Sequence, residues 1–326
     1  MRIKVLSGGR KSIELPLSDA ELNFQMKRIG IEETVPVCRL VEASEKDNPL
    51  CKFEGQTVNM DEVNFFAKRM DCLTEYERKV LYSYVTDYGV GTMQDLINLT
   101  FSMKGLSLIT DFSDAEQVGK RLYLDEFIAM SEEEKQTNFI KFAEKTFKES
   151  RVEVLPYGVF VEHGFEMQEV YNGKTFPEYF ASDEIVAAIE VQNQAGDTEY
   201  LYLPTDICSM NKVKERLQVM DFWEMKVTDI YNIRLPDILV PMPENIDCVE
   251  ALTLFNETCQ AVKHFDEVQM KQLAMVVEFA RFSSPTEVTR LAKLLGEFEV
   301  NPFVHNDEEY GKYMVEESGL PALCLP

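Results

Sequence analysis

Few residues of this chain stand at a spacing that supports catalysis. Its three histidines, His163, His264 and His305, do not form HExxH or another metal-ligand pattern. The short glycine turns at residues 7–9 and 89–91 lack the spacing of a phosphate-binding loop, and no GxSxG or EF-hand sequence occurs. We therefore expect a protein without enzymatic activity, cofactor or metal. An enzyme whose site has no recognisable motif is a weaker alternative hypothesis.

Carboxylates, by contrast, are abundant. The 326 residues include 57 acidic and 33 basic side chains, which gives a formal net charge of −24. A charge of this sign repels nucleic acids and anionic membrane surfaces, so a conventional nucleic-acid binder is excluded. The content of 45% hydrophobic and 11% aromatic residues is that of a folded chain rather than of an acidic disordered one. The length predicts two or three domains.

The acidic excess is uneven along the sequence. Residues 1–50 are balanced, with eight acidic and eight basic side chains, whereas residues 151–200 hold ten acidic and two basic ones. A second acidic run covers residues 111–134, with a counterpart in residues 307–317. Such runs are typical of a solvated surface that keeps a protein soluble. They would also suit mimicry of a polyanion, because duplex DNA presents about one charge per 1.7 Å and a carboxylate-bearing protein could fill a basic DNA groove.

The carboxylates selected as candidate DNA-mimicking, partner-binding groups lie in these two acidic stretches. They are Asp111, Asp114, Glu116, Asp125, Glu126, Glu132, Glu133, Glu153, Glu162, Glu166, Glu169, Glu178, Asp183 and Glu184.

The elements that must position these carboxylates occur twice. The pattern of residues 1–31 predicts a strand, a glycine turn, a second strand ending at Pro16, and a helix. Residues 189–219 show the same pattern, with Pro204 standing 188 positions after Pro16. Further on, Gly119-Lys120 matches Gly311-Lys312 at an offset of 192. The sequence therefore predicts a duplicated chain.

Helix starts are predicted where a capping side chain is followed three residues later by Glu or Gln. These pairs are Ser18 with Glu21, Asn59 with Glu62, Thr74 with Glu77, Ser113 with Glu116, Ser131 with Glu134, Asp247 with Glu250, Asp266 with Gln269, Ser284 with Glu287 and Asn306 with Glu309. We predict an α+β fold, an elongated chain of small α/β modules and helical bundles. The five modules are expected at residues 1–58, 59–128, 129–181, 182–240 and 241–326.

Other local patterns predict a β-hairpin and two sets of core residues. Residues 154–173 alternate and contain turn signals at His163-Gly164 and Asn172-Gly173, which predicts a hairpin or meander with His163 at the surface. Helical spacing and composition predict these core side chains: Phe65, Phe66, Met70, Leu73, Trp223, Leu273, Val276, Val277 and Phe279.

The seven cysteines show no CxxC spacing and form an odd set. Free thiols in a reducing compartment are expected, rather than disulfides or a zinc site. No apolar run reaches the length of about 18 residues that a membrane span needs, and the N-terminal apolar run is too short for a signal peptide. We expect a cytoplasmic protein that does not associate with membranes.

Several segments resemble the ArdA family of antirestriction proteins, which conjugative elements and other mobile genetic elements carry. The similarity is clearest in residues 93–100 (MQDLINLT), 111–126 with Gly119-Lys120-Arg121-Leu122-Tyr123, 136–142 (QTNFIKF) and 157–164 (YGVFVEHG). It covers most of residues 1–181, and residues 182 to about 320 look like a partial second copy in tandem. One departure is Lys141, which stands where family members tend to carry an acidic residue.

The resemblance implies a non-enzymatic DNA mimic that fills the DNA-binding groove of a type I restriction-modification enzyme or another defence protein. Such proteins are elongated acidic dimers, and in this chain both a homodimer and an intramolecular pseudo-dimer of the two copies fit. The rival hypothesis is a protein-interaction module of a mobile element whose acidic charge serves only solubility. The sequence does not name the target.

Overall fold

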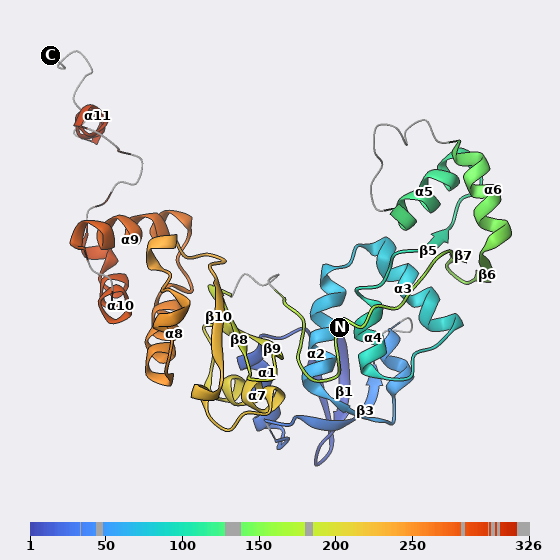
Figure 1. The fold of residues 1–326 in the computed structure, drawn as a ribbon, viewed down its shortest axis with the longest axis horizontal. Helices are drawn as coiled ribbons and strands as arrows, with labels where there is room; N and C mark the ends of the chain where they lie inside the picture. Colours follow the sequence, from blue (N-terminus) through green and yellow to red (C-terminus); the bar gives the residue numbers. More distant parts are fainter. Residues whose placement is uncertain are drawn as a thin grey trace. The chain divides into compact units, whose positions relative to one another are not determined.

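The computed structural model describes residues 1–32, 34–43, 48–127, 138–179, 185–281, 284–298, 300, 304 and 307–317. Its helices and small antiparallel sheets form the mixed α+β fold that the sequence predicts (Figure 1). The chain divides into two compact units: unit 1 contains Met1–Pro177 and Ile207–Lys212, and unit 2 contains Glu178–Asp206 and Val213–Pro326. The finer division into five modules stays a prediction.

Unit 1 begins with a four-stranded antiparallel sheet of order β2-β1-β3-β4. Its strands are β1 (Arg2–Leu6), β2 (Arg10–Glu14), β3 (Val37–Ala43) and β4 (Thr57–Asn59). Gly8 and Gly9 form the turn between β1 and β2 with φ angles of 60° and 143°, a region that favours glycine. Ile3, Val5 and Ile13 point from one face of the sheet into the core.

Several helices contribute to the core of unit 1. They are α1 (Asp19–Arg28), the 3₁₀ helix η1 (Pro49–Phe53), α2 (Met60–Cys72), α3 (Glu75–Asp87) and α4 (Met93–Leu99). Phe66 of α2, Leu81 of α3 and Leu96 of α4 are fully buried. Among the predicted core residues, Phe65, Met70 and Leu73 are buried as well, so the helical spacing identified this core correctly.

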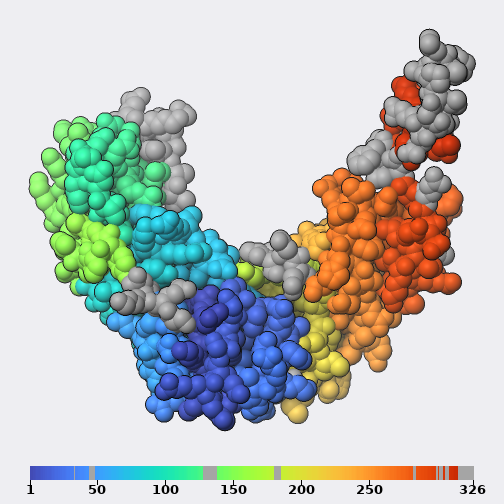
Figure 2. All heavy atoms as spheres, turned by 180° about the vertical axis from the view of Figure 1, so that it is seen from behind, coloured from blue at the N-terminus to red at the C-terminus, as the bar shows by residue number. Residues whose placement is uncertain are grey.

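A second sheet of unit 1, of order β5-β7-β6, packs against α3 and against two further helices. The elements are β5 (Leu106–Ile109), α5 (Ala115–Phe127), α6 (Phe139–Glu149), β6 (Arg151–Leu155) and β7 (Gly158–Glu162). A Cβ atom at Gly119 of α5 would collide with the carbonyl oxygen of Phe139, so glycine permits the close approach of α5 and α6. In the space-filling view the atoms of these two helices (green) form one continuous surface (Figure 2).

Unit 2 is built on a three-stranded sheet of order β10-β8-β9. Its strands are β8 (Ala187–Gln192), β9 (Thr198–Leu203) and β10 (Lys226–Tyr231). The helices that follow β9 are α7 (Ile207–Leu217, whose first six residues belong to unit 1), α8 (Val249–Val262), α9 (Glu267–Ala280), α10 (Pro285–Lys293) and α11 (Asp307–Glu317). Short 3₁₀ helices are η3 (Phe222–Glu224), η4 (Asp237–Leu239), η5 (Pro243–Asn245) and η6 (Leu295–Glu297).

Part of the internal structure of unit 1 is repeated in unit 2. The strand β1 lies between β2 and β3, as β8 lies between β9 and β10. In both sheets the register between two neighbouring strands skips one residue: Val41 of β3 opposite β1, and Thr228 of β10 opposite β8. Equivalent ion pairs within single helices also occur 192 positions apart. Lys79–Glu75 of α3 corresponds to Lys271–Glu267 of α9, and α5 and α11 show the same relation.

Most predicted helix caps are present. Ser18 with Glu21, Thr74 with Glu77 and Asp266 with Gln269 form capping boxes, and Ser284 caps α10 by accepting a hydrogen bond from the Glu287 amide. Asn59 caps α2 through the amide of Asp61.

Two predicted caps are wrong. At α5 the amides of Glu116 and Gln117 donate to Asp114, because this carboxylate adjoins the helix start, so Asp114 caps the helix in place of Ser113. The helix α8 begins at Val249 with Cys248 at its N-cap and no side-chain bond, so Asp247 is not its cap. The predictions at Ser131 and Asn306 lie outside the described residues.

Two predicted core residues, Phe279 and Trp223, are wrong. For Phe279 the reason is that a helical pattern does not reveal what covers a face. Phe279 of α9 is 91% exposed, although Leu273, Val276 and Val277 are buried. Its counterpart in α3, Asp87, is covered by an ion pair with Arg151 of β6, and unit 2 has no counterpart of β6 among the described residues.

Trp223 is 64% exposed in η3. Its neighbour Phe222 takes the buried position there instead.

The predicted hairpin exists, but its turn lies elsewhere. Strands β6 and β7 pair in register from Arg151↔Glu162 to Leu155↔Gly158, so Pro156-Tyr157 forms the turn. The His163-Gly164 pair follows β7, and residues 165–179 form no strand. His163 is only 6% exposed, so the expectation of a surface histidine is wrong: its ring faces β5 and α5 across the sheet.

The six cysteines in the described part of the chain are all free, as predicted, and burial raises the pKa of Cys38 to about 11. No helix in that same part is both long and apolar enough to cross a membrane.

Candidate functional site

The acidic side chains of the described residues are, with one exception, exposed or half-buried. Glu199 is the one buried carboxylate among the described residues, with 2% of its surface exposed, and it is paired with Arg216 at 3.0 Å. The remaining described carboxylates are exposed or half-buried. Among the described residues the acidic charge therefore lies at the surface and not in the core.

Three candidate carboxylates lie where the chain enters α5. Asp111, Asp114 and Glu116 are exposed. The backbone amide of Ser113 donates a hydrogen bond to Asp111 at 2.8 Å and lowers the pKa of its carboxyl. Asp114 accepts from two amides at the first turn of α5, where negative charge is favoured by the helix dipole. These backbone bonds hold two negative charges in fixed positions.

Asp125, near the end of α5, is engaged within unit 1. Its carboxylate accepts hydrogen bonds from Tyr76 and Ser107, each at 2.7 Å, and is paired with Arg121 at 3.0 Å. The Arg121 guanidinium lies 3.3 Å from the centre of the Tyr76 ring. With 12% of its side chain exposed and a cation beside it, Asp125 offers less charge to a partner than its position in an acidic run indicates.

Glu126 faces His163, which in turn contacts Ser107. His163 Nε2 lies 2.9 Å from Ser107 Oγ, and Nδ1 lies 3.5 Å from a Glu126 carboxylate oxygen. This order of contacts resembles a serine, histidine and acid triad, but the Ser107 hydroxyl donates to Asp125 and is fully buried. A nucleophile must reach its substrate, so the arrangement supports packing and not acyl transfer.

Glu153 and Glu162 lie around Arg151 on the β6–β7 hairpin. Arg151 is paired with Asp87 of α3 at 3.0 Å and lies 3.6 Å from Glu153, and its guanidinium stacks 4.1 Å from the Tyr88 ring centre. Burial raises the pKa of Glu162, and the Asp87 charge adds to the effect. One arginine thus pairs with two carboxylates, and Glu162 lies opposite it in the register of the hairpin.

Glu166 and Glu169 are exposed on the irregular segment after β7. A buried amide, Asn98, anchors this segment: it accepts from the Val170 and Tyr171 amides at 3.0 and 2.6 Å and donates to the Tyr171 carbonyl at 2.9 Å. Asn98 belongs to the 93–100 segment that carries the resemblance described above.

One remaining candidate is described by the structure and four are not. Glu178 is exposed at the start of unit 2. Glu132, Glu133, Asp183 and Glu184 lie outside the described residues. Lys141 is exposed on α6, so a positive charge does stand at that surface.

Sequence reasoning missed Glu190 in the central strand of unit 2. Its carboxylate accepts hydrogen bonds from the hydroxyls of Thr228 at 2.7 Å and Tyr231 at 3.0 Å, and the Tyr200 hydroxyl lies 3.5 Å away. In the strand of residues 187–192 (AAIEVQ), Glu190 lies on the face opposite the buried Ile189 and Val191. This strand alternation is the sequence pattern from which the position of Glu190 could have been predicted.

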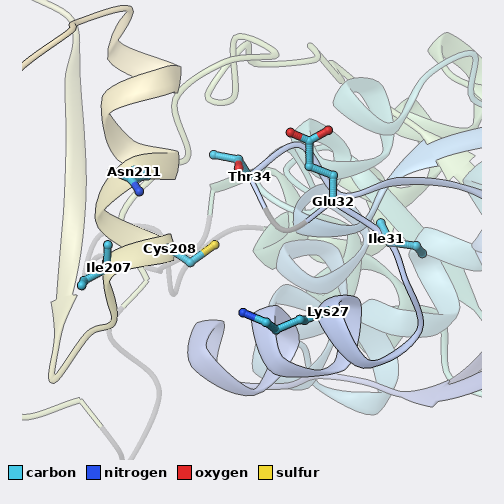
Figure 3. Close-up of a pocket in the computed structure, with 7 residues that line it drawn as sticks. All are labelled: Lys27, Ile31, Glu32, Thr34, Ile207, Cys208 and Asn211. Carbon is cyan, nitrogen blue, oxygen red and sulfur yellow. The ribbon is translucent and has the colours of Figure 1, made fainter.

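A cavity of about 520 Å³ lies within unit 1 beside α1 and the first residues of α7. Its lining residues are Lys27, Ile31, Glu32, Thr34, Ile207, Cys208 and Asn211. Lys27 extends toward α7, and the Cys208 sulfur points back toward α1 (Figure 3). These described residues include no histidine, and they form no arrangement with a recognisable reaction.

Within the described ranges no group of three His, Cys, Asp or Glu side chains is placed to hold a metal ion. Comparisons with protein-family models, with curated proteins and with solved structures find no match to this chain.

Proposed function

We propose that this protein is a non-enzymatic DNA mimic that inhibits a type I restriction-modification enzyme or a related defence protein by occupying its DNA-binding groove. The observation that carries the proposal is the surface position of the carboxylates, of which Glu199 alone is buried among the described residues. A net charge of −24 equals that of about 12 base pairs of duplex DNA.

Both copies carry the acidic excess. Residues 1–181 contain 31 acidic and 22 basic side chains, and residues 182–326 contain 26 acidic and 11 basic ones. The second copy is shorter and yet more acidic. This distribution supports a role for the whole chain in presenting negative charge.

Fixed carboxylates support the proposal further. Backbone amides hold Asp111 and Asp114, and Asn98 anchors the segment that carries Glu166 and Glu169. A partner that binds preorganised charges loses less conformational entropy than one that binds mobile side chains. Electrostatic attraction would also speed the encounter with a basic groove.

The test is competition with DNA. Purified protein is titrated into a type I restriction-modification enzyme bound to a fluorescent DNA duplex, at low and at moderate salt, and cleavage is followed in parallel. We expect displacement of DNA, loss of cleavage, and an affinity that falls steeply with salt. Absence of both displacement and inhibition at low salt, with this enzyme and with other basic DNA-binding proteins, would refute the proposal.

A matched pair of variants separates mimicry from a role of the charge in solubility alone. The triple variant Glu166→Gln, Glu169→Gln, Glu178→Gln removes three exposed charges from the acidic stretch. The control Glu14→Gln, Glu32→Gln, Glu42→Gln removes three charges from the balanced first 50 residues. Mimicry predicts that the first variant inhibits much less than the control. Equal inhibition by both would favour the solubility reading.

A further inference from the structure

One side of α9 in unit 2 exposes apolar side chains. Val268 is 39% exposed, Met275 37% and Phe279 91%, and the last value is the largest among the large apolar residues described. Spacings of seven and four residues place these three side chains along one side of the helix, and we call them the α9 stripe. On the other side of α9, Leu273 and Val277 are buried in unit 2.

The same positions of α3 in unit 1 are covered. They are Tyr76, Ser83 and Asp87, each 192 positions earlier. The Tyr76 hydroxyl accepts a hydrogen bond from the Leu108 amide of β5 at 3.0 Å, and Ser83 is fully buried. Asp87 is paired with Arg151 of β6 at 3.0 Å. This side of α3 is therefore a packing face, on which the sheet β5-β7-β6 lies.

The two faces differ in the opposite sense from what solvation favours. The covered face of α3 carries a phenol, a hydroxyl and a carboxylate, whereas the exposed face of α9 carries valine, methionine and phenylalanine at these positions. A side chain that only lost its cover would be better solvated if it were polar. Apolar side chains grouped on an exposed face are typical of a surface that packs against another protein. The contrast indicates that the α9 stripe has an apolar partner of its own.

Charged side chains lie along one edge of the α9 stripe. Glu267, Lys271 and Glu278 are exposed, and a rotation of about 100° per residue puts all three on the same side of the stripe. Within the helix Lys271 is paired with Glu267 at 2.6 Å, at a surface where a second carboxylate can approach the same ammonium. Lys271 and Glu278 are separated by about 10 Å along the helix axis.

A second α9 that runs antiparallel complements this pattern. If a twofold axis passes midway between Lys271 and Glu278, the lysine of one helix lies opposite the glutamate of the other, and symmetry repeats the pair. Met275 then lies near the axis, and Val268 of one helix lies within a turn of Phe279 of the other. A parallel pair would instead place like charges opposite each other. The charges therefore favour the antiparallel arrangement.

We infer that the α9 stripe binds the α9 stripe of a second copy of this chain. Such a symmetric contact buries three apolar side chains from each copy and forms two ion pairs. The inference rests neither on the proposed function nor on the family resemblance, because it is argued from α9 and its counterpart α3 alone. One helix face is smaller than a standard interface of about 800 Å² per partner, so the dimer should be weak, with a Kd on the order of 100 µM.

The test uses the full chain, with sedimentation equilibrium at about 0.15 M salt and protein concentrations from about 10 µM to about 1 mM. Phe279→Asp and Met275→Ser introduce the residues that α3 carries at these positions. The matched control is Met220→Asp, which changes an apolar side chain of unit 2 that is 82% exposed. We expect Phe279→Asp to weaken the dimer about tenfold and Met275→Ser about threefold, whereas Met220→Asp changes its Kd less than about twofold.

Charge reversals test the orientation of the two helices. Glu278→Lys changes the net charge by +2, from −24 to −22, which by itself would ease the association of two acidic chains. The antiparallel pair predicts the opposite, a dimer about fivefold weaker, because Lys271 would then face a lysine. The double variant Lys271→Glu, Glu278→Lys keeps the native net charge and should dimerise as the native protein does.

Three results would overturn the inference. The first is a native protein that stays monomeric at about 1 mM. The second is a dimer that responds equally to Phe279→Asp and Met220→Asp, since association would then not depend on the α9 stripe. The third is a double variant that dimerises no better than Glu278→Lys, since the lysine and the glutamate would then not face each other. Circular dichroism checks that each variant is folded.

Discussion

Asn64 and Asn256 make the same pair of hydrogen bonds, one in each unit. Asn64 accepts from the Leu17 amide at 2.8 Å and donates to the Leu17 carbonyl at 2.9 Å. Asn256 accepts from the Thr205 amide at 2.7 Å and donates to the Thr205 carbonyl at 3.0 Å. Leu17 and Thr205 each follow a proline just after the second strand of their sheet. The asparagine side chains join these residues to α2 and α8. The repeat thus extends to the tertiary contacts that join sheet and helix.

Replacing these amides should destabilise the two units independently. Asn64 is buried, so Asn64→Ala should lower the free energy of unfolding by about 2 kcal/mol, and the half-buried Asn256→Ala by about 1 kcal/mol. The two changes share no partner, so the double variant should show the sum to within about 0.5 kcal/mol. Urea unfolding followed by circular dichroism measures all three. A deviation from the sum well above that figure would mean that the sites are coupled.

Asn98→Ala should release the segment that carries Glu166 and Glu169. The substitution removes three hydrogen bonds to residues 170 and 171 and should cost about 2 kcal/mol. Hydrogen exchange at the Val170 and Tyr171 amides should become faster, while exchange in β8 and β9 should not change. Unchanged protection at those two amides would show that Asn98 does not anchor the segment.

His163 should make stability depend on pH. Burial lowers the pKa of this histidine, and the nearby carboxylates of Glu126 and Asp125 offset only part of that effect. The unfolded chain therefore binds a proton at higher pH than the folded one, so stability falls as the pH drops below about 6.5. We expect the free energy of unfolding to be lower at pH 5.5 than at pH 7. In His163→Gln this loss should be absent, which urea titrations at both pH values can measure.

Glu162 should act in the opposite direction. Its pKa is raised, first by burial and then by the Asp87 charge. The ionised carboxylate therefore destabilises the folded state at neutral pH, and this destabilisation disappears when the carboxyl is protonated. At pH 7, Glu162→Gln should increase the free energy of unfolding by a few tenths of a kcal/mol and so raise the melting temperature slightly. Near pH 4 the substitution should have no effect. A stabilisation that persists at pH 4 would point to a packing effect instead.

The two faces of α9 should respond differently to truncation. Leu273 is fully buried, and Leu273→Ala should cost about 3 kcal/mol. Phe279 is exposed, and Phe279→Ala should change the free energy of unfolding by no more than about 0.5 kcal/mol. Thermal unfolding of both variants provides the comparison. A large loss in Phe279→Ala would contradict the exposed position of this ring.

What the sequence predicted correctly depends on short-range chemistry. The capping boxes at Ser18, Thr74 and Asp266 need only residues three positions apart, so a local pattern identifies them. Strand and helix order, the repeat and the buried positions of α2 follow from periodicity in the same way. Asp114 displaced Ser113 as a cap because two oxygen-bearing side chains compete for the same amides, and spacing alone does not rank them.

What the sequence did not predict depends on contacts between distant segments. His163 is buried because β7 aligns with β5 and brings the ring to Ser107, which is 56 positions earlier. The Glu190 cluster joins residues of three strands, and only the register of the sheet shows that Tyr200, Thr228 and Tyr231 meet one carboxylate. The acidic runs indicated charge but not that Asp125 is paired with Arg121.

The surface position of the carboxylates also has a consequence for the solution around the molecule. Side chains that are solvated and negative hold an excess of small cations close to the protein, much as the phosphates of DNA do. A basic partner that covers this surface sets those ions free. Part of the driving force for association would then be the entropy gained by the released ions, in addition to the contacts between the two proteins.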